Sequence, residues 1–188
     1  HRDLHSFPTR RSSDLELIEH NTSADPVEVF LRLRKETDAP MHGPLHHVLA
    51  PLAFLMAYRA RWGEPSDEAI EKAVSEATEL KGGICASWGA CGAAVGMGIA
   101  YAAILVATPL RGEPRGRAQA VVAATMQRLA DLRAARCCRR DSLVALEVAC
   151  ELSSALLPHP LETSFREDCD QVEANRECIG EDCSWYKA

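Results

Sequence analysis

Apolar residues recur at intervals of three and four along most of the chain, which is the spacing of amphipathic helices. Asp25 and Pro26 supply the N-cap and first residue of a helix that runs to Lys35, and Gly63 ends a strongly apolar helix over 45–62. The pattern predicts further helices over 67–80, 90–108, 117–134 and 142–157, the last capped by Asp141 after a loop over 109–116. The sequence therefore predicts an all-α, compact helical bundle.

The stretch from Gly82 to Leu110 contains no charged residue and is rich in glycine and alanine. Its length would suffice to cross a bilayer. It is a single candidate between amphipathic helices, however, and its glycines would allow neighbouring helices to approach closely. We therefore expect a buried central helix around which the bundle packs, and a membrane role is disfavoured.

The two ends of the chain differ from its body. Residues 1–15 lack apolar periodicity, and ordinary codons for them spell a common sequencing-library adapter, so we interpret them as a non-native adapter-derived segment. We then expect the native N-terminus, with any signal peptide or upstream domain, to be missing. The helical domain should cover 16–164, with an irregular cysteine-rich tail over 165–188 packed on it, because the tail has too little apolar surface to fold unaided.

Composition narrows the function classes. The formal net charge of −6 argues against a nucleic-acid surface, and the 5% aromatic content suits helix packing. Eight cysteines suggest a metal site, active thiols or disulfides. Disulfide scaffolds are usually short and poor in core, so they are the weakest of the three, and we expect a cytoplasmic domain.

The cysteines near the last helix and in the tail are the candidate metal ligands. Cys137 and Cys138 lie among arginines just before a helix, where positive charge and the helix dipole favour thiolate. One of the two could coordinate while the other packs, and either could be an ordinary buried residue. Three tail thiols could be ordered by coordinating the same metal, although a disulfide or a loose tail would explain them too. The tail thiols are Cys169, Cys178 and Cys183.

A second set of residues could bind a cofactor. Cys85 and Cys91 lie six positions apart in a glycine-rich approach to the central helix, where small residues chosen for close packing are an equal alternative. His42, His46 and His47 begin the second helix, and capping or surface roles are commoner for such histidines. Cys150, on an apolar helix face, is most simply a core residue.

Four segments together resemble the prokaryotic family DUF5714: MHGPLHHVLAPLAFLMAYR, GGICASWGACGAAVGMGIAYAAIL, RCCRRDSLVALEVACELS, and three tail cysteines spaced C-x8-C-x4-C before Trp-Tyr. The resemblance covers about 41–186, and it implies no assigned activity. Its members are associated with anaerobes and sometimes with methyltransferase-like or radical-SAM-like regions. Ser184 departs from the proline expected after the last cysteine. The positions that the resemblance marks are His42, His46, His47, Cys85, Cys91, Cys137, Cys138, Cys169, Gln171, Asn175, Cys178 and Cys183.

The leading hypothesis is a domain that binds zinc or an iron–sulfur cluster through the cysteines near the last helix and in the tail. It requires the tail to fold back over Cys137 and Cys138. A second hypothesis is an accessory thiol domain that serves a fused or separate enzyme partner of the methyltransferase or radical-SAM type. A third is a structural module without catalysis.

Overall fold

The computed structural model describes residues 21–187, so the adapter-derived segment predicted at 1–15 lies outside the described residues. The prediction of an all-α fold is confirmed, since the described residues contain helices and no strand. The helices are α2 (Pro26–Glu36), α3 (Leu45–Trp62), α4 (Asp67–Thr78), α5 (Ile84–Ser87), α6 (Gly92–Leu105), α7 (Gly112–Asp131), α8 (Cys138–Leu156) and the short 3₁₀ helix η2 (Gly180–Asp182).

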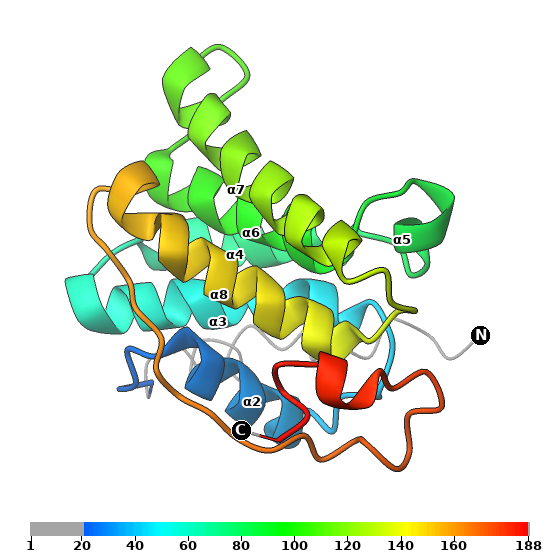
Figure 1. The fold of residues 1–188 in the computed structure, drawn as a ribbon. Helices are drawn as coiled ribbons and strands as arrows, with labels where there is room; N and C mark the ends of the chain where they lie inside the picture. The colour runs from blue at the N-terminus through cyan, green and yellow to red at the C-terminus, as the bar shows by residue number, and fades with distance from the viewer. Residues whose placement is uncertain (1–20, 188) are drawn as a thin grey trace.

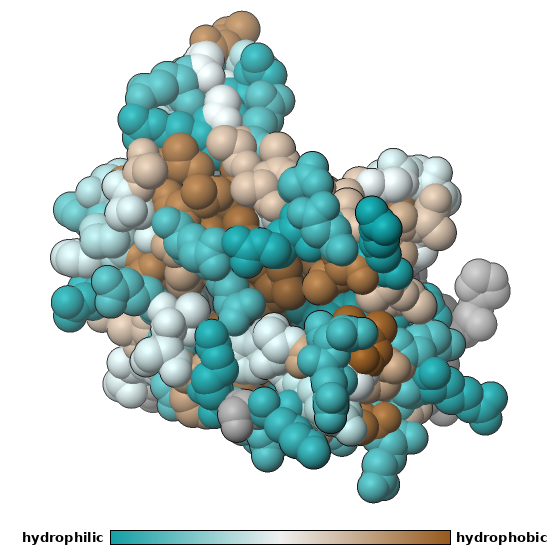
Figure 2. Space-filling model, viewed as in Figure 1, coloured by the Kyte–Doolittle hydropathy of each residue, from teal (hydrophilic) through white to brown (hydrophobic). Residues whose placement is uncertain are grey.

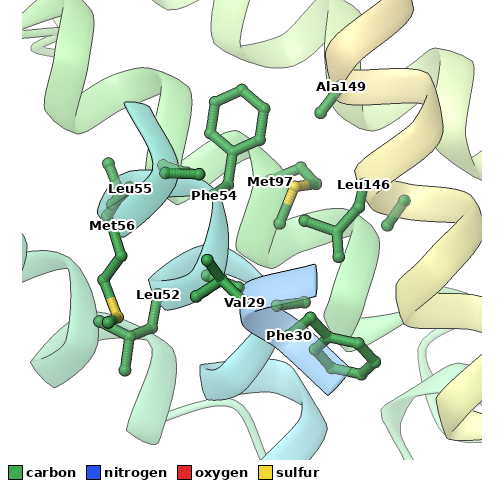
Figure 3. Close-up of a cluster of buried hydrophobic side chains, with 14 of the residues drawn as sticks. Val29, Phe30, Leu52, Phe54, Leu55, Met56, Met97, Leu146 and Ala149 are labelled. Carbon is green, nitrogen blue, oxygen red and sulfur yellow. The ribbon is translucent and has the colours of Figure 1, made fainter. Parts of the chain in front are cut away.

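Helix α6 is the central helix that the sequence predicted. It packs against α3, α4, α7 and α8, while α2 packs against α3 and α8 (Figure 1). Side chains from α2, α3, α6 and α8 meet in one apolar core (Figure 3), and burial of this kind is the main source of stability. The residues labelled in Figure 3 are Val29, Phe30, Leu52, Phe54, Leu55, Met56, Met97, Leu146 and Ala149.

Two glycines of α6 allow its close approach to α3, as the sequence predicted. A Cβ atom at Gly92 would lie 2.3 Å from Cδ2 of His47, and one at Gly96 would lie 2.9 Å from Cδ of Pro51. Both distances are shorter than a van der Waals contact, so neither position has room for a side chain without movement. The first turns of α3 and α6 are therefore held in direct contact.

Two helices begin earlier than the sequence predicted. Helix α7 begins at Gly112 and not at 117, because Pro114 lies in the first turn, where its missing N–H removes no helical hydrogen bond. Helix α8 begins at Cys138 and not at 142, so the prediction that Asp141 is its N-cap is wrong. The N–H of Asp141 instead donates to the Cys137 carbonyl at 2.8 Å, as in a first helical turn.

The tail leaves the far end of α8 and returns to the beginning of the same helix. In Figure 1 it passes from the end of α8 along α2, and η2 then lies beside the first turn of α8. Tail and helices are joined by ion pairs, among them Lys35 with Glu167 at 3.0 Å and Arg166 with Glu147 at 3.0 Å. Trp185 is fully buried against the helical core. The tail is thus packed on the helices along most of its length.

Hydrophilic side chains cover much of the face seen in Figure 2, with apolar patches over the helices. Among residues 21–187, no helix combines the length and hydropathy that a membrane span requires.

Candidate functional site

Four cysteines from two distant parts of the chain line one small cavity. Cys137 comes from the N-cap of α8, and Cys169, Cys178 and Cys183 come from the tail. The cavity volume is about 20 Å³, which is room for a group the size of one water molecule. Polar side chains of both segments, including Gln171 and Asn175, complete the lining. All eight cysteines of the chain are free thiols.

Asp25 anchors the tail at the point where it crosses α2. Its carboxylate accepts hydrogen bonds from the backbone N–H groups of Ser164 and Phe165 at 2.8 and 2.9 Å, and from the Thr163 hydroxyl at 2.8 Å. Burial alone would raise the pKa of Asp25, but together these donors outweigh burial and hold the pKa below its ordinary value. The same carboxylate caps α2 through the N–H of Val27, so one side chain fixes both segments.

Asp170 fixes the tail next to the cysteines. One of its carboxylate oxygens lies 3.5 Å from Nη1 of Arg34 and 3.4 Å from Nε of Arg139. The two guanidinium groups are 6% and 1% exposed, whereas Asp170 is 46% exposed. Within the described part of the chain, Nε and Nη2 of Arg139 have no hydrogen-bond partner. Because Arg139 also lines the four-cysteine cavity, a buried guanidinium group that is ion-paired with Asp170 borders the thiols.

The tail backbone forms tight turns around its cysteines. The Cys178 N–H donates to the Asn175 carbonyl at 3.1 Å, and the Cys183 N–H donates to the Gly180 carbonyl at 2.9 Å. The Gly180 N–H donates to the Cys178 sulfur at 3.4 Å. Gly180 has a φ of 56°, a conformation that glycine adopts without strain.

Cys137 and Cys138 have higher pKa values than the sequence led us to expect. Burial raises the pKa of both thiols, and the backbone N–H and guanidinium of Arg140 lower that of Cys137 by less. The sequence showed the neighbouring arginines and the helix start, which both favour thiolate, but it did not show how deeply the two thiols are buried. In the absence of a cation, both groups are therefore neutral thiols near neutral pH.

Cys138 does not line the four-cysteine cavity. Its sulfur interacts with the Gly43 N–H, and burial and the carboxylate of Asp141 raise its pKa. Burial and the same carboxylate raise the pKa of Cys91, which lies at the N-cap of α6. Of the five candidate metal ligands, the structure thus brings four together and leaves Cys138 outside the cavity.

The three candidate histidines lie near the start of α3 and outside the cavity lining. His46 is fully buried and His47 is 8% exposed, so neither has the surface role that is commoner for such residues. Nδ1 of His47 lies 3.2 Å from the Leu80 carbonyl oxygen. Burial, together with the charge of Arg34, lowers the pKa of His46 to about 4. His42 Nδ1 and both ring nitrogens of His46 have no partner among the described side chains and backbone.

The remaining thiols lie elsewhere. Cys85 and Cys91 line a separate, larger cavity. Cys150 is partly buried against the apolar core, in agreement with its predicted packing role. Within residues 21–187, no three His, Cys, Asp or Glu side chains form a group that could hold one metal ion in the present conformation.

Sequence reasoning missed the pairing of Arg34 and Arg139 with Asp170. A signal for Arg34 was present, because it follows Val27, Phe30 and Leu31 on the apolar face of α2 at helical spacing. A charged residue on such a face must find a buried partner. The pattern does not say that the partner lies in the tail.

Comparison with known proteins places the chain in a family. No curated protein and no solved structure matches it significantly. One family model matches residues 15–186, a longer stretch than the resemblance first suggested. The chain therefore belongs to DUF5714, which is described as a family of unknown function.

Proposed function

We propose that the protein is a metal- or iron–sulfur-binding domain whose centre is held by Cys137, Cys169, Cys178 and Cys183. The observation that carries this proposal is that four free thiols, from the start of α8 and from the tail, line the same cavity. These four are half of the eight cysteines of the chain. Such a convergence is typical of a site with a chemical purpose.

The donor set fits soft metals. Thiolate ligands select zinc, copper(I) and iron–sulfur centres over the harder ions that prefer oxygen. Four cysteines are the usual complement for structural zinc and for common iron–sulfur clusters. Gln171 and Asn175, whose side chains border the thiols, could donate hydrogen bonds to sulfur.

The charge around the cavity also fits. Four thiolates around a divalent ion carry a net negative charge, and a buried negative group requires a positive partner. Arg139 is 1% exposed and borders the cavity, its Nε is ion-paired with Asp170, and its Nη2 has no hydrogen-bond partner among the described residues. Arg140 borders the cavity as well. Although Arg139 is also paired with Asp170 and Arg140 with Asp141, these guanidinium groups would offset part of the charge of the loaded centre.

Binding would require the thiols to turn toward a shared centre, since the described residues do not form an ion-holding group as they stand. Each cysteine can do so by rotation about one bond. The tail around them consists of turns and one short 3₁₀ helix, which adapt more readily than a long helix. A metal would displace the thiol protons and would contribute folding free energy to the tail.

The proposal includes a reducing compartment such as the cytoplasm, where cysteines remain free thiols. We also propose that the loaded centre serves an enzyme partner, which is either fused to this domain or separate from it.

The experiment is anaerobic purification followed by elemental analysis and visible spectroscopy of the wild type and two variants. We expect stoichiometric zinc or iron in the wild type, and loss of most of that metal in Cys178→Ser. Cys150→Ser is the matched control, because Cys150 is also a partly buried thiol but does not line the cavity. Metal-free wild type after supply of both metals, or equal loss in both variants, would refute the proposal.

A further inference from the structure

Cys85 and Cys91 stand at the two ends of a closed loop between α4 and α6. The Ala90 N–H donates to the Ile84 carbonyl at 3.4 Å, which joins the two residues immediately preceding the cysteines. Gly89, inside the loop, has a φ of 66° and allows the chain to turn back. The backbone itself therefore brings the two cysteines near one another.

Both thiols line a cavity that is separate from the four-cysteine cavity. Its volume is about 430 Å³, within the range of small-molecule pockets. Cys85 is exposed, whereas Cys91 is partly buried at the base of α6. An incoming molecule would therefore meet Cys85 first and Cys91 second.

We infer that Cys85 and Cys91 form a dithiol–disulfide site that exchanges two electrons with a small disulfide bearing carboxylates. The Cys85 thiolate attacks one sulfur of that disulfide, a mixed disulfide forms, and the first small thiol leaves. The Cys91 sulfur then attacks Cys85, closes the intramolecular disulfide and releases the second small thiol. The two thiol protons of the protein end on the two released thiols, so two cysteines are oxidised and one disulfide is reduced.

The order of attack agrees with the surroundings of the two sulfurs. Burial raises the pKa of Cys91 to about 11, so very little of this thiol is ionised at neutral pH and it is the weaker first nucleophile of the pair. Exchange with a disulfide from solution also requires an accessible attacking sulfur, and of the two cysteines Cys85 is the exposed one.

The lining of the cavity indicates the class of disulfide. Met126 and Leu129 of α7 provide an apolar wall. Arg136 and Arg140 contribute two positive charges against the single carboxylate of Asp141. A net positive lining favours a negatively charged ligand over a cationic one of similar size.

The experiment follows the two cysteines in one tryptic peptide. The segment 82–111 lies between Lys81 and the bond after Arg111 and contains Cys85 and Cys91 but no other cysteine. Reduced full-length protein is incubated with glutathione disulfide, and in parallel with the cationic disulfide cystamine, before alkylation and mass spectrometry. We expect this peptide to lose both alkylation sites without retaining glutathione, and to react several-fold faster with glutathione disulfide than with cystamine.

Three variants make the test specific. Cys91→Ser should accumulate glutathione on Cys85, Arg136→Gln should reduce the preference for glutathione disulfide, and Cys150→Ser should behave as wild type. Circular dichroism verifies that each variant is folded. A Cys91→Ser protein that traps no glutathione on Cys85 would overturn the pairing, and equal rates with the two disulfides would overturn the proposed class of substrate. The four cysteines of the proposed metal centre lie outside the measured peptide, so this result is independent of metal binding.

Discussion

Cys137 and Cys138 are adjacent in the chain, yet only Cys137 lines the cavity shared with the tail cysteines. The sulfur of Cys138 interacts instead with the backbone N–H of Gly43. The cause is the position of the helix start, because Cys137 is the extended N-cap residue and Cys138 is the first helical residue. Successive residues across such a boundary point in different directions.

This difference predicts opposite results for two neighbouring substitutions. Cys137→Ser should remove most of the bound metal, whereas Cys138→Ser should leave the metal content near that of wild type. Elemental analysis of both proteins, prepared in parallel without oxygen, measures the difference. Metal loss in Cys138→Ser alone would mean that the wrong member of the pair has been assigned to the centre.

Asp25 should contribute more to stability than an ordinary N-cap. Asp25→Ala removes the cap of α2 and the acceptor for Ser164 and Phe165, so we expect a loss of about 2–4 kcal/mol in the free energy of unfolding. Ser66→Ala, which removes only the cap of α4, should cost about 1 kcal/mol. Urea denaturation measures both values. Limited proteolysis should cleave the tail faster in Asp25→Ala only.

Gly92→Ala should destabilise the protein by about 1–3 kcal/mol, because the new methyl group would overlap the His47 ring unless α3 and α6 separate. Gly116→Ala is the control. Gly116 lies within α7, and no neighbouring atom lies within 4 Å of the position that its methyl group would occupy, so alanine there should stabilise the helix by about 1 kcal/mol. Thermal denaturation should therefore shift in opposite directions for the two variants.

Stability should fall between about pH 6.5 and pH 4 because of His46. The pKa of this buried ring is about 4 in the folded protein and 6.5 without burial, so the unfolded chain binds the extra proton in this interval. Stability therefore rises with pH across the interval, by about 3 kcal/mol in total. His46→Phe should flatten this part of the pH profile in urea denaturation. His159→Gln, at a half-exposed position, should retain the slope.

The sequence was sufficient to predict most of the helices. Helix α3 has the bounds predicted from its apolar run and from Gly63, because a glycine in the left-handed conformation ends a helix locally. The starts of α7 and α8 were missed because the sequence carries no equally clear local signal at Gly112 and Cys138. Pro114 and Asp141 are common at helix beginnings, and their presence inside a first turn depends on packing that the pattern does not contain.

The candidate site was predicted in part. The cysteine pattern marked Cys137 and the three tail thiols, and the structure places them around one cavity. The cysteine pattern could not exclude Cys138 from that set, because whether Cys137 or Cys138 faces the cavity depends on the residue at which α8 begins. Nor could it identify Asp170 as the partner of Arg34, because an ion pair between residues so far apart is set by the path of the tail.

Arg140 lines both the four-cysteine cavity and the cavity that contains Cys85 and Cys91. Neutralising it would change the electrostatic potential at two groups of sulfur atoms simultaneously. Mutagenesis of the two cavities must therefore begin with Arg139, which lines only the four-cysteine cavity, and Arg136, which lines only the cavity of Cys85 and Cys91.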